Sequence, residues 1–223
     1  NTFCMNRLLL LSVTLAFIAT ACTSKCTIKG EASLNQLSGK TIYLKFLDNN
    51  ATWVTLDSAK IIHGSFVLDY PHVKSPKLVT LFMDCVPLTP VVLEPGNVNI
   101  SITSSDLLIH GTPLNDRLYS FYKDNQEIER KIRDQSQQLC TDDFYESVTQ
   151  AHQALIKNFM LSNRNNILGP TVFSIYHSQY PELFQSGELE MLMNTTSTLF
   201  DTDVNHQTAA MNRFDELKGF LYW

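Results

Sequence analysis

The sequence predicts an α+β protein in which an N-terminal antiparallel β-sandwich or barrel-like domain is followed by a helical hairpin and short C-terminal helices. Between residues 26 and 111, apolar residues alternate with polar ones, as they do in half-buried strands. From Thr112 onward, apolar residues recur at helical spacing instead. Short strands separated by turn signals are typical of sandwiches and barrels, so the change of period predicts β structure first and helices second.

Alternation and turn residues define the predicted strands. Every second residue is apolar in residues 41–46 and 97–102. His63-Gly64 predicts a tight hairpin, because glycine accepts positive φ freely and histidine is enriched there. Pro95-Gly96 predicts a type II turn before the second of these strands.

Two apolar stripes predict two long helices. Thr112-Pro113 supplies an N-cap followed by proline at the first helical position. The first stripe contains Leu114, Leu118, Phe121, Ile128, Ile132 and Leu139, and is interrupted by Asn125 and Gln135. After a second cap at Thr141, the second stripe contains Phe144, Val148, Ala151, Leu155 and Phe159. We expect these helices to pack as an antiparallel hairpin. Gly169-Pro170 predicts a shorter helix, and two more are expected at residues 182–193 and 204–221.

The N-terminus resembles the leader of a bacterial lipoprotein precursor. A short cationic opening, Met5-Asn6-Arg7, precedes an uncharged run over residues 8–21 that is too short for a permanent membrane span. Ala19-Thr20-Ala21-Cys22 resembles a lipobox, although the family usually has leucine where Ala19 stands. The resemblance implies lipid attachment to the thiol of Cys22, and two or more acyl chains would anchor the protein stably. Ordinary secretion is the alternative interpretation.

The predicted organisation has four parts. These are a signal peptide over residues 1–21, an anchor and linker over 22–25, a β domain over 26–111 and an α-helical region over 112–223. Residues 1–4 precede the expected initiator Met5 and are left out of the structural prediction.

A set of short motifs resembles domain-of-unknown-function family 4369, the N-terminal module of thioredoxin-like thiol:disulfide oxidoreductase lipoproteins of Bacteroidota. The motifs are Cys26-Thr27-Ile28-Lys29-Gly30, Tyr43-Leu44, Asp57-Ser58-Ala59, Gly64-Ser65-Phe66, Leu93-Glu94-Pro95-Gly96 and Gly111-Thr112-Pro113-Leu114-Asn115. Residues 163–170 look like the helical continuation of that module, so the resemblance covers about residues 26–180. His63 stands where the family usually has Asp or Asn, a change that the turn can accommodate.

The resemblance implies a location in the bacterial cell envelope, facing the periplasm or the cell surface, but it does not imply catalysis. Two-domain relatives continue into a thioredoxin-like domain with a Trp-Cys-x-x-Cys motif, and this sequence contains no Cys-x-x-Cys pair. We therefore expect a lipid-anchored, non-enzymatic binding or interaction module with an envelope protein partner, which could be thioredoxin-like. The alternative is an accessory module or fragment of a thiol–disulfide oxidoreductase. No cofactor is expected.

Candidate chemical groups each have a structural alternative. The formal net charge of −5 argues against nucleic-acid binding, which needs clustered Lys and Arg. The possible metal ligands are Asp142, Glu146 and His152, or Asp201, Asp203 and His206, but acids at a helix N-terminus are explained by the helix dipole. We therefore expect no metal site.

Cysteines, one serine and two aromatic residues complete the candidates. Cys85, in an apolar strand-like segment, and Cys140, at an expected helix end, lack the paired motif of a redox site, and one disulfide among Cys26, Cys85 and Cys140 stays open. Asp57-Ser58 suggests a reactive serine or, more simply, strand pairing and turn entry. Trp53 and Tyr70 could form a carbohydrate or peptide platform or pack in the core.

Overall fold

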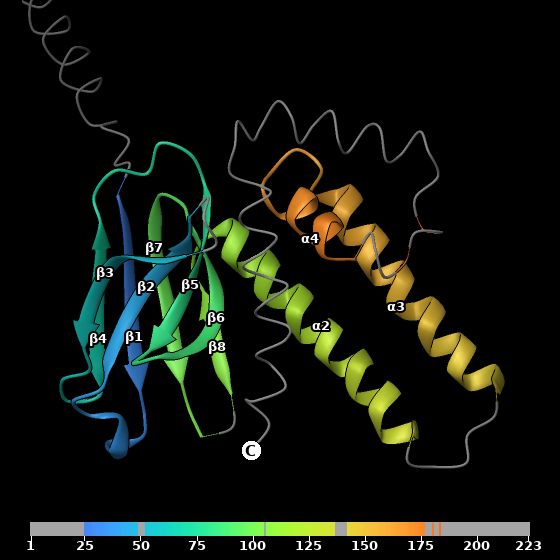
Figure 1. The fold of residues 1–223 in the computed structure, drawn as a ribbon, viewed down its shortest axis with the longest axis horizontal. Coiled ribbons are helices and arrows are strands. Elements are labelled where there is room, and N and C mark those ends of the chain that lie inside the picture. The colour runs from blue at the N-terminus through green and yellow to red at the C-terminus, as the bar shows by residue number, and fades with distance from the viewer. Residues whose placement is uncertain are drawn as a thin grey trace, which may run out of the picture.

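The computed structural model describes residues 25–48, 52–104, 106–136 and 142–176, together with Tyr180 and Leu183. Within them, eight strands form two four-stranded sheets and helices follow, which confirms the predicted α+β class (Figure 1). The strands are β1 (Cys26–Ala32), β2 (Thr41–Leu47), β3 (Trp53–Lys60), β4 (Ser65–Tyr70), β5 (Lys77–Met83), β6 (Val86–Leu93), β7 (Gly96–Ile102) and β8 (Leu107–His110). A short 3-10 turn, η1 (Asn35–Leu37), precedes β2, and the helices are α2 (Pro113–Ser136), α3 (Asp142–Ser162) and α4 (Leu168–Tyr176).

The two sheets stack as a sandwich with the strand orders β4-β1-β7-β8 and β3-β2-β5-β6. Pairing is antiparallel between the named strands with one exception, since β1 and β7 run parallel from Cys26↔Gly96 to Ala32↔Ile102. The prediction of an antiparallel sandwich is therefore wrong at this central pair. The chain crosses from β6, in the opposite sheet, into β7. Strand β7 can therefore begin beside Cys26, the first residue of β1, and run in the same direction as β1.

The chain turns at both predicted places, but each turn connects the two sheets instead of neighbouring strands. His63 and Gly64 have φ of 51° and 78°, as a type I′ turn requires, and Ile62 and Ser65 exchange backbone hydrogen bonds across it. The strands on either side, β3 and β4, belong to different sheets, so the predicted hairpin is wrong as a strand pair. Gly96 has a positive φ of 135° where the chain passes from β6 to β7, which differs from the φ of about 80° that the predicted type II turn requires there. Both turns close the ends of the sandwich.

The main core lies between the sheets and consists of the alternating residues that the sequence pattern selects. Ile42 and Leu44 of β2 face Val98 and Ile100 of β7 within one cluster of buried side chains. At Gly30, opposite Phe66 in the register, an added Cβ would overlap the Phe66 ring. Gly30, in the first family-like motif, therefore leaves the space that the ring of Phe66, in the fourth motif, occupies.

The helices pack beside the sandwich, with α2 against β6 and β8 and α3 on the far side of α2 (Figure 1). Leu114 and Leu118 of α2 join Leu78 and Val92, which project from the outer face of one sheet, and Leu168 of α4 joins the same cluster. A second helical cluster joins α2, α3 and α4. No helix in the described ranges combines the length and apolarity that a membrane span requires.

The buried face of α3 differs from the predicted stripe. Phe144 is 38 % exposed and Ala151 is exposed, whereas the buried residues are Val148, His152, Ile156 and Met160. Leu155 and Phe159 are only half-buried. The stripe prediction is confirmed for Val148 and wrong for Phe144 and Ala151, because the hydrogen bonds of His152 turn a polar residue inward and leave an apolar edge of α3 at the surface. The helices expected at residues 182–193 and 204–221 lie outside the described residues.

Candidate functional site

The junction between the sandwich and α2 is built on a buried carboxylate. Glu94, which follows β6, is 7 % exposed, and its Oε1 accepts hydrogen bonds from the backbone N–H groups of Leu114 (2.7 Å) and Asn115 (3.2 Å). These donors belong to the first turn of α2, which has no intrahelical acceptor for them. A carboxylate there also complements the positive end of the helix dipole. Glu94 thus caps α2 from another element.

Asn115 fastens the same turn to strand β6. Its Oδ1 accepts the backbone N–H of Val92 (2.8 Å), and its Nδ2 donates to the Val92 carbonyl (2.8 Å) and to the hydroxyl of Thr112 (2.8 Å). The side chain therefore pairs with the outer edge of β6 as a further strand would. Asp116 accepts the backbone N–H of Gly111 (2.8 Å), which fixes the turn that leads into the helix.

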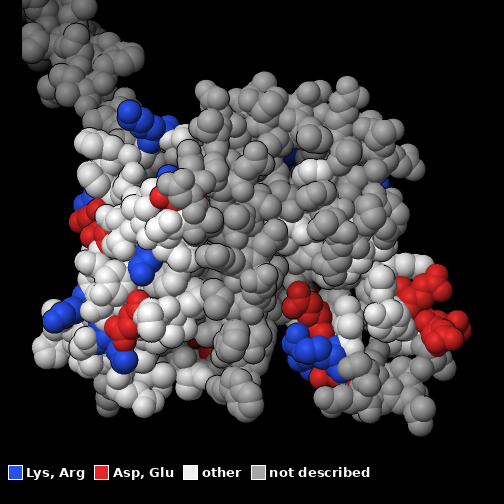
Figure 2. Space-filling model, in the orientation of Figure 1, with Lys and Arg blue, Asp and Glu red and all other residues white. Residues whose placement is uncertain are grey.

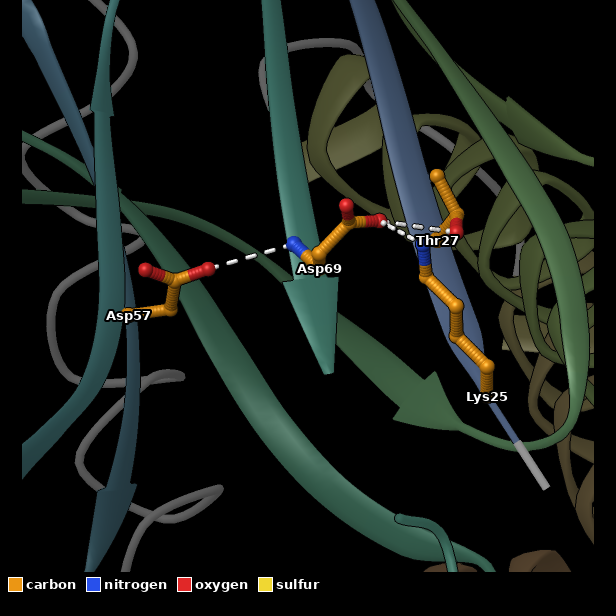
Figure 3. A network of polar contacts seen from close by, with 4 residues as sticks. All are labelled: Lys25, Thr27, Asp57 and Asp69. Atoms are coloured by element: carbon orange, nitrogen blue, oxygen red, sulfur yellow. Dashed lines mark hydrogen bonds and ion pairs between the residues drawn. The ribbon is translucent and has the colours of Figure 1, made fainter. Parts of the chain in front are cut away.

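A second polar network ties the two sheets together at the edge strand β4 (Figure 3). Asp57 of β3 accepts the backbone N–H groups of Ser58 (2.7 Å) and, across the corner, Asp69 (3.2 Å). The Asp69 carboxylate accepts the Thr27 hydroxyl (2.8 Å) and pairs with the Lys25 ammonium (3.1 Å). The hydroxyl of Thr27, followed by Lys25, holds the pKa of Asp69 below its usual range.

Asp57 therefore has a structural role. Both of its carboxylate oxygens accept backbone N–H groups, which favours strand connection over activation of Ser58. Its bond to Asp69 also occupies part of the exposed edge of β4, and natural sheets commonly protect such edges from pairing with other chains.

A comparison with family models matches residues 26–118 to a domain of unknown function, DUF4369. Residues 26–118 form a DUF4369 domain. This confirms the resemblance over the sandwich and the first turns of α2. No curated protein matches the chain.

The junction lies inside the DUF4369 domain, because the match ends at Leu118. The family-like motifs around Glu94 and Asn115 supply the cap and the strand contact, and Gly111 has a positive φ of 112° with no room for a Cβ beside the Asn97 carbonyl. The sequence alone gave these residues no role, because their partners are about 20 positions away. The side chains of Glu94 and Asn115 bind backbone groups and so stabilise the fold.

At the C-terminal end of the matched region and beyond it, α2 and α3 border a groove of about 400 Å³. Its apolar floor consists of Phe121, Leu155 and Phe159, and the rings of Phe121 and Phe159 lie 4.3 Å apart. The polar rim consists of Arg117, Ser120, Asp124, Ser162 and Asn163. The groove uses the half-buried edge of α3, and its volume falls in the range of ligand and peptide-side-chain pockets.

Charges at the groove are arranged along α2. Arg117 and Asp124 are seven residues apart, which places them about 10 Å apart along the helix axis. The Arg117 guanidinium donates one hydrogen bond, 3.3 Å long, to the Asn163 side chain, and no described carboxylate forms an ion pair with it. On the visible face of the described sandwich, by contrast, basic and acidic side chains are interspersed (Figure 2). The groove therefore combines an apolar floor with a guanidinium that pairs with none of the described carboxylates.

Next to the groove, a buried hydrogen-bonded chain crosses the helices. His152 of α3 is 3 % exposed, and its Nε2 lies 2.7 Å from Oδ1 of Asn125, a fully buried residue of α2. Its Nδ1 lies 2.9 Å from the hydroxyl of Tyr180, and Asn125 Nδ2 donates to Glu129 at 2.7 Å. Burial lowers the pKa of His152, and Glu129 opposes that shift. Asn125, which only interrupts a stripe in the sequence, is thus a partner of His152.

The metal candidates do not come together. Asp142 and Glu146 are exposed on α3, whereas His152 is buried and engaged with Asn125 and Tyr180. Among the residues that the structure describes, no three His, Cys, Asp or Glu side chains are grouped for a metal ion. The other candidates, Asp201, Asp203 and His206, lie outside the described residues.

The thiols have different environments. Cys26 is buried at the start of β1, and burial raises the pKa of its thiol. Cys85 is exposed beside Asp84, which has a φ of 53°, in the turn between β5 and β6, so the strand-like assignment of Cys85 is wrong. Both thiols are free. Cys22 and Cys140 lie outside the described residues.

The proposed aromatic platform does not form as one surface. Trp53 packs edge-on against Phe82 at 4.9 Å on the outer side of its sheet. Tyr70 instead packs against the core between the sheets. The two aromatic residues therefore belong to different environments.

Proposed function

We propose that this chain is a lipid-anchored, non-enzymatic binding module of the bacterial cell envelope, in which the DUF4369 domain supports a helical groove that captures a peptide segment of a partner protein. The observation that carries the proposal is the groove between α2 and α3, with its floor of Phe121 and Phe159 and the guanidinium of Arg117 at its rim. An apolar side chain would fill the floor, and a neighbouring carboxylate would pair with Arg117.

The lipobox-like sequence around Cys22 supports the anchor. Cys22 stands four residues before the first residue of β1, so an extended chain would separate them by at most about 14 Å. A lipid at Cys22 would therefore hold the sandwich close to the membrane surface, with the helical groove attached through the Glu94 junction. The intact mass of protein isolated from its native membrane tests this part. An acylated chain beginning at Cys22 is expected, and an unmodified, soluble chain would contradict the anchor.

The non-enzymatic part of the proposal is supported by how the domain uses its polar groups. Glu94, Asn115 and Asp57 all bind backbone groups, which is the arrangement expected of polar groups that hold the fold together. Turnover of a substrate at enzyme-like rates, abolished by a single substitution, would contradict this part.

Selection from a displayed peptide library on the soluble mature chain tests the groove. We expect selected peptides to pair an apolar residue with an acidic one, and to lose at least tenfold in affinity for S120R and R117Q. Ser120→Arg fills the groove from an exposed position of α2, and Ser120→Ala is its matched control. Failure to select peptides, or binding that S120R leaves unchanged, would reject the groove as the binding site.

The second candidate is an accessory role in thiol–disulfide exchange beside a thioredoxin-like partner, and the exposed thiol of Cys85 favours it. Under this alternative, a Cys-x-x-Cys protein would form a mixed disulfide with the wild-type chain and lose it in C85S. Under the main proposal, the chain alone reduces no insulin and C85S binds peptides normally.

A further inference from the structure

We propose that the groove between α2 and α3 takes a short extended segment of a partner protein in which an acidic and a basic side chain flank an apolar one. The acid lies at the Arg117 end of the groove and the base at the Asp124 end. This charge pattern rests on the proposed function, since it describes the segment that the groove binds. It follows from the order in which the groove residues stand along the two helices.

The groove has a cationic end, an apolar middle and an anionic end. On α2, Arg117, Phe121 and Asp124 follow one another at spacings of four and three residues, so they lie on one face of the helix. At one end, Arg117 bonds to Asn163, which directly follows the last residue of α3. Phe121, one turn further along α2, packs on Phe159, which precedes Asn163 by four residues. The two helices therefore run antiparallel, and the charges of Arg117 and Asp124 stand on either side of the apolar floor.

Asn163 holds the guanidinium of Arg117 in place at the cationic end. Asn163 is buried, its Oδ1 accepts from the Asn166 side chain (3.0 Å), and its Nδ2 donates to the Phe159 carbonyl (2.8 Å). The same Oδ1 accepts one N–H of Arg117 at 3.3 Å. A guanidinium carries five N–H groups, and two of them can bind one carboxylate side by side. Arg117 is thus oriented before a ligand arrives, which favours a carboxylate at this end.

Asp124 supplies the opposite charge at the other end. Its side chain is exposed, and it lines the groove together with Leu155 of α3. None of the ion pairs between described residues includes Asp124. A carboxylate at the rim attracts a lysine or arginine of a bound segment and repels a second acid, so it sets the specificity of the groove more than its affinity. We therefore expect a basic side chain at this end.

The separation of the two charged ends matches an extended segment of about five residues. Arg117 and Asp124 are about 10 Å apart along α2, and the long Arg117 side chain leans toward the helix N-terminus, which takes its charge further from Asp124. In an extended chain, alternate side chains point the same way and each residue advances about 3.3 Å. An acid, an apolar residue and a base at alternate positions therefore span about 13 Å. A groove of about 400 Å³ is small for a ligand site, which suits such a segment better than a helix.

Fluorescence anisotropy with variants of the tightest peptide selected on the groove tests the charge pattern. Three versions with blocked termini carry lysine, glutamine or glutamate two residues from the apolar side chain, on the side away from the acid. We expect the wild-type chain to bind the lysine version about two- to fivefold more tightly than the glutamine version, as for an exposed ion pair. D124N should lose this preference, and D124K should prefer the glutamate version. D134N, which changes an exposed acid of α2 outside the groove lining, is the matched control and should behave as wild type.

Three results would overturn the charge pattern. The first is a wild-type chain without a preference for lysine, or a preference that D124N retains. The second is binding only when the two charges of the peptide stand seven positions apart, which indicates a bound helix. The third is self-association of the chain, measured by sedimentation velocity, that S120R abolishes, since a second copy would then be the occupant. The first two leave binding sensitive to S120R, whereas peptide binding that S120R does not change rejects the proposed function itself.

Discussion

Replacing Glu94 by alanine should show how strongly the junction holds α2 on the sandwich. The substitution removes the acceptor for the N–H groups of Leu114 and Asn115, both in buried hydrogen bonds. An unsatisfied buried donor costs about 1–3 kcal/mol, and loss of a helix cap costs about 0.5–2 kcal/mol. Since the second bond is longer than the first and the two costs overlap, we expect a loss of about 2–4 kcal/mol. Glu94→Gln keeps an oxygen acceptor and loses the charge, so it should cost only about 1 kcal/mol.

Urea unfolding measures these differences, with Asp116→Ala as a control that removes a single exposed hydrogen bond of the same turn. Hydrogen exchange at Leu114 and Asn115 locates the effect, and it should accelerate in E94A before exchange in β1 does. If undocking of α2 leaves the sandwich folded, E94A should unfold in two steps. An E94A variant within 0.5 kcal/mol of wild type, or with β1 and α2 exchanging equally, would refute the capping role.

Three further predictions concern the domain. G30A should lose about 1–3 kcal/mol in urea unfolding, because its methyl group would displace the Phe66 ring, and F66L should relieve part of that loss; unchanged stability would contradict the close contact. Cys85 should react with a thiol reagent in the folded protein, whereas Cys26 should react only on unfolding, which mass spectrometry of labelled peptides measures. D57A should increase association in light scattering, because it frees part of the β4 edge, whereas D57N keeps an acceptor and should stay close to wild type.

The local pattern predicted much of the domain. Alternation identified the strands, and His63-Gly64 and Pro95-Gly96 identified turns that do have positive φ. Thr112-Pro113 placed the start of α2 at its observed first residue, Pro113. These signals are short-range, because strand alternation, turn conformation and helix capping each depend on a few neighbouring residues.

Other features depend on residues that the sequence separates. The parallel register of β1 with β7 joins positions about 70 residues apart, and nothing in either strand specifies the direction of its neighbour. Polar residues gave the clearest error, since the periodicity of α3 selected Phe144 for burial when the structure buries His152. Burial of an imidazole is favourable only where hydrogen-bond partners are present for its nitrogens. For His152 one such partner is Asn125, which belongs to another helix, α2.

The sequence by itself determined the α+β order of elements, the turn positions and the likeness to DUF4369, because each rests on local spacing of residue types. Only the tertiary structure decided that Glu94 caps a helix, that Asn125 and His152 share a buried bond, and that α2 and α3 border an apolar groove. The physical reason is that hydrophobic periodicity records which residues leave water. The partners of a buried polar group are set instead by which elements meet in space.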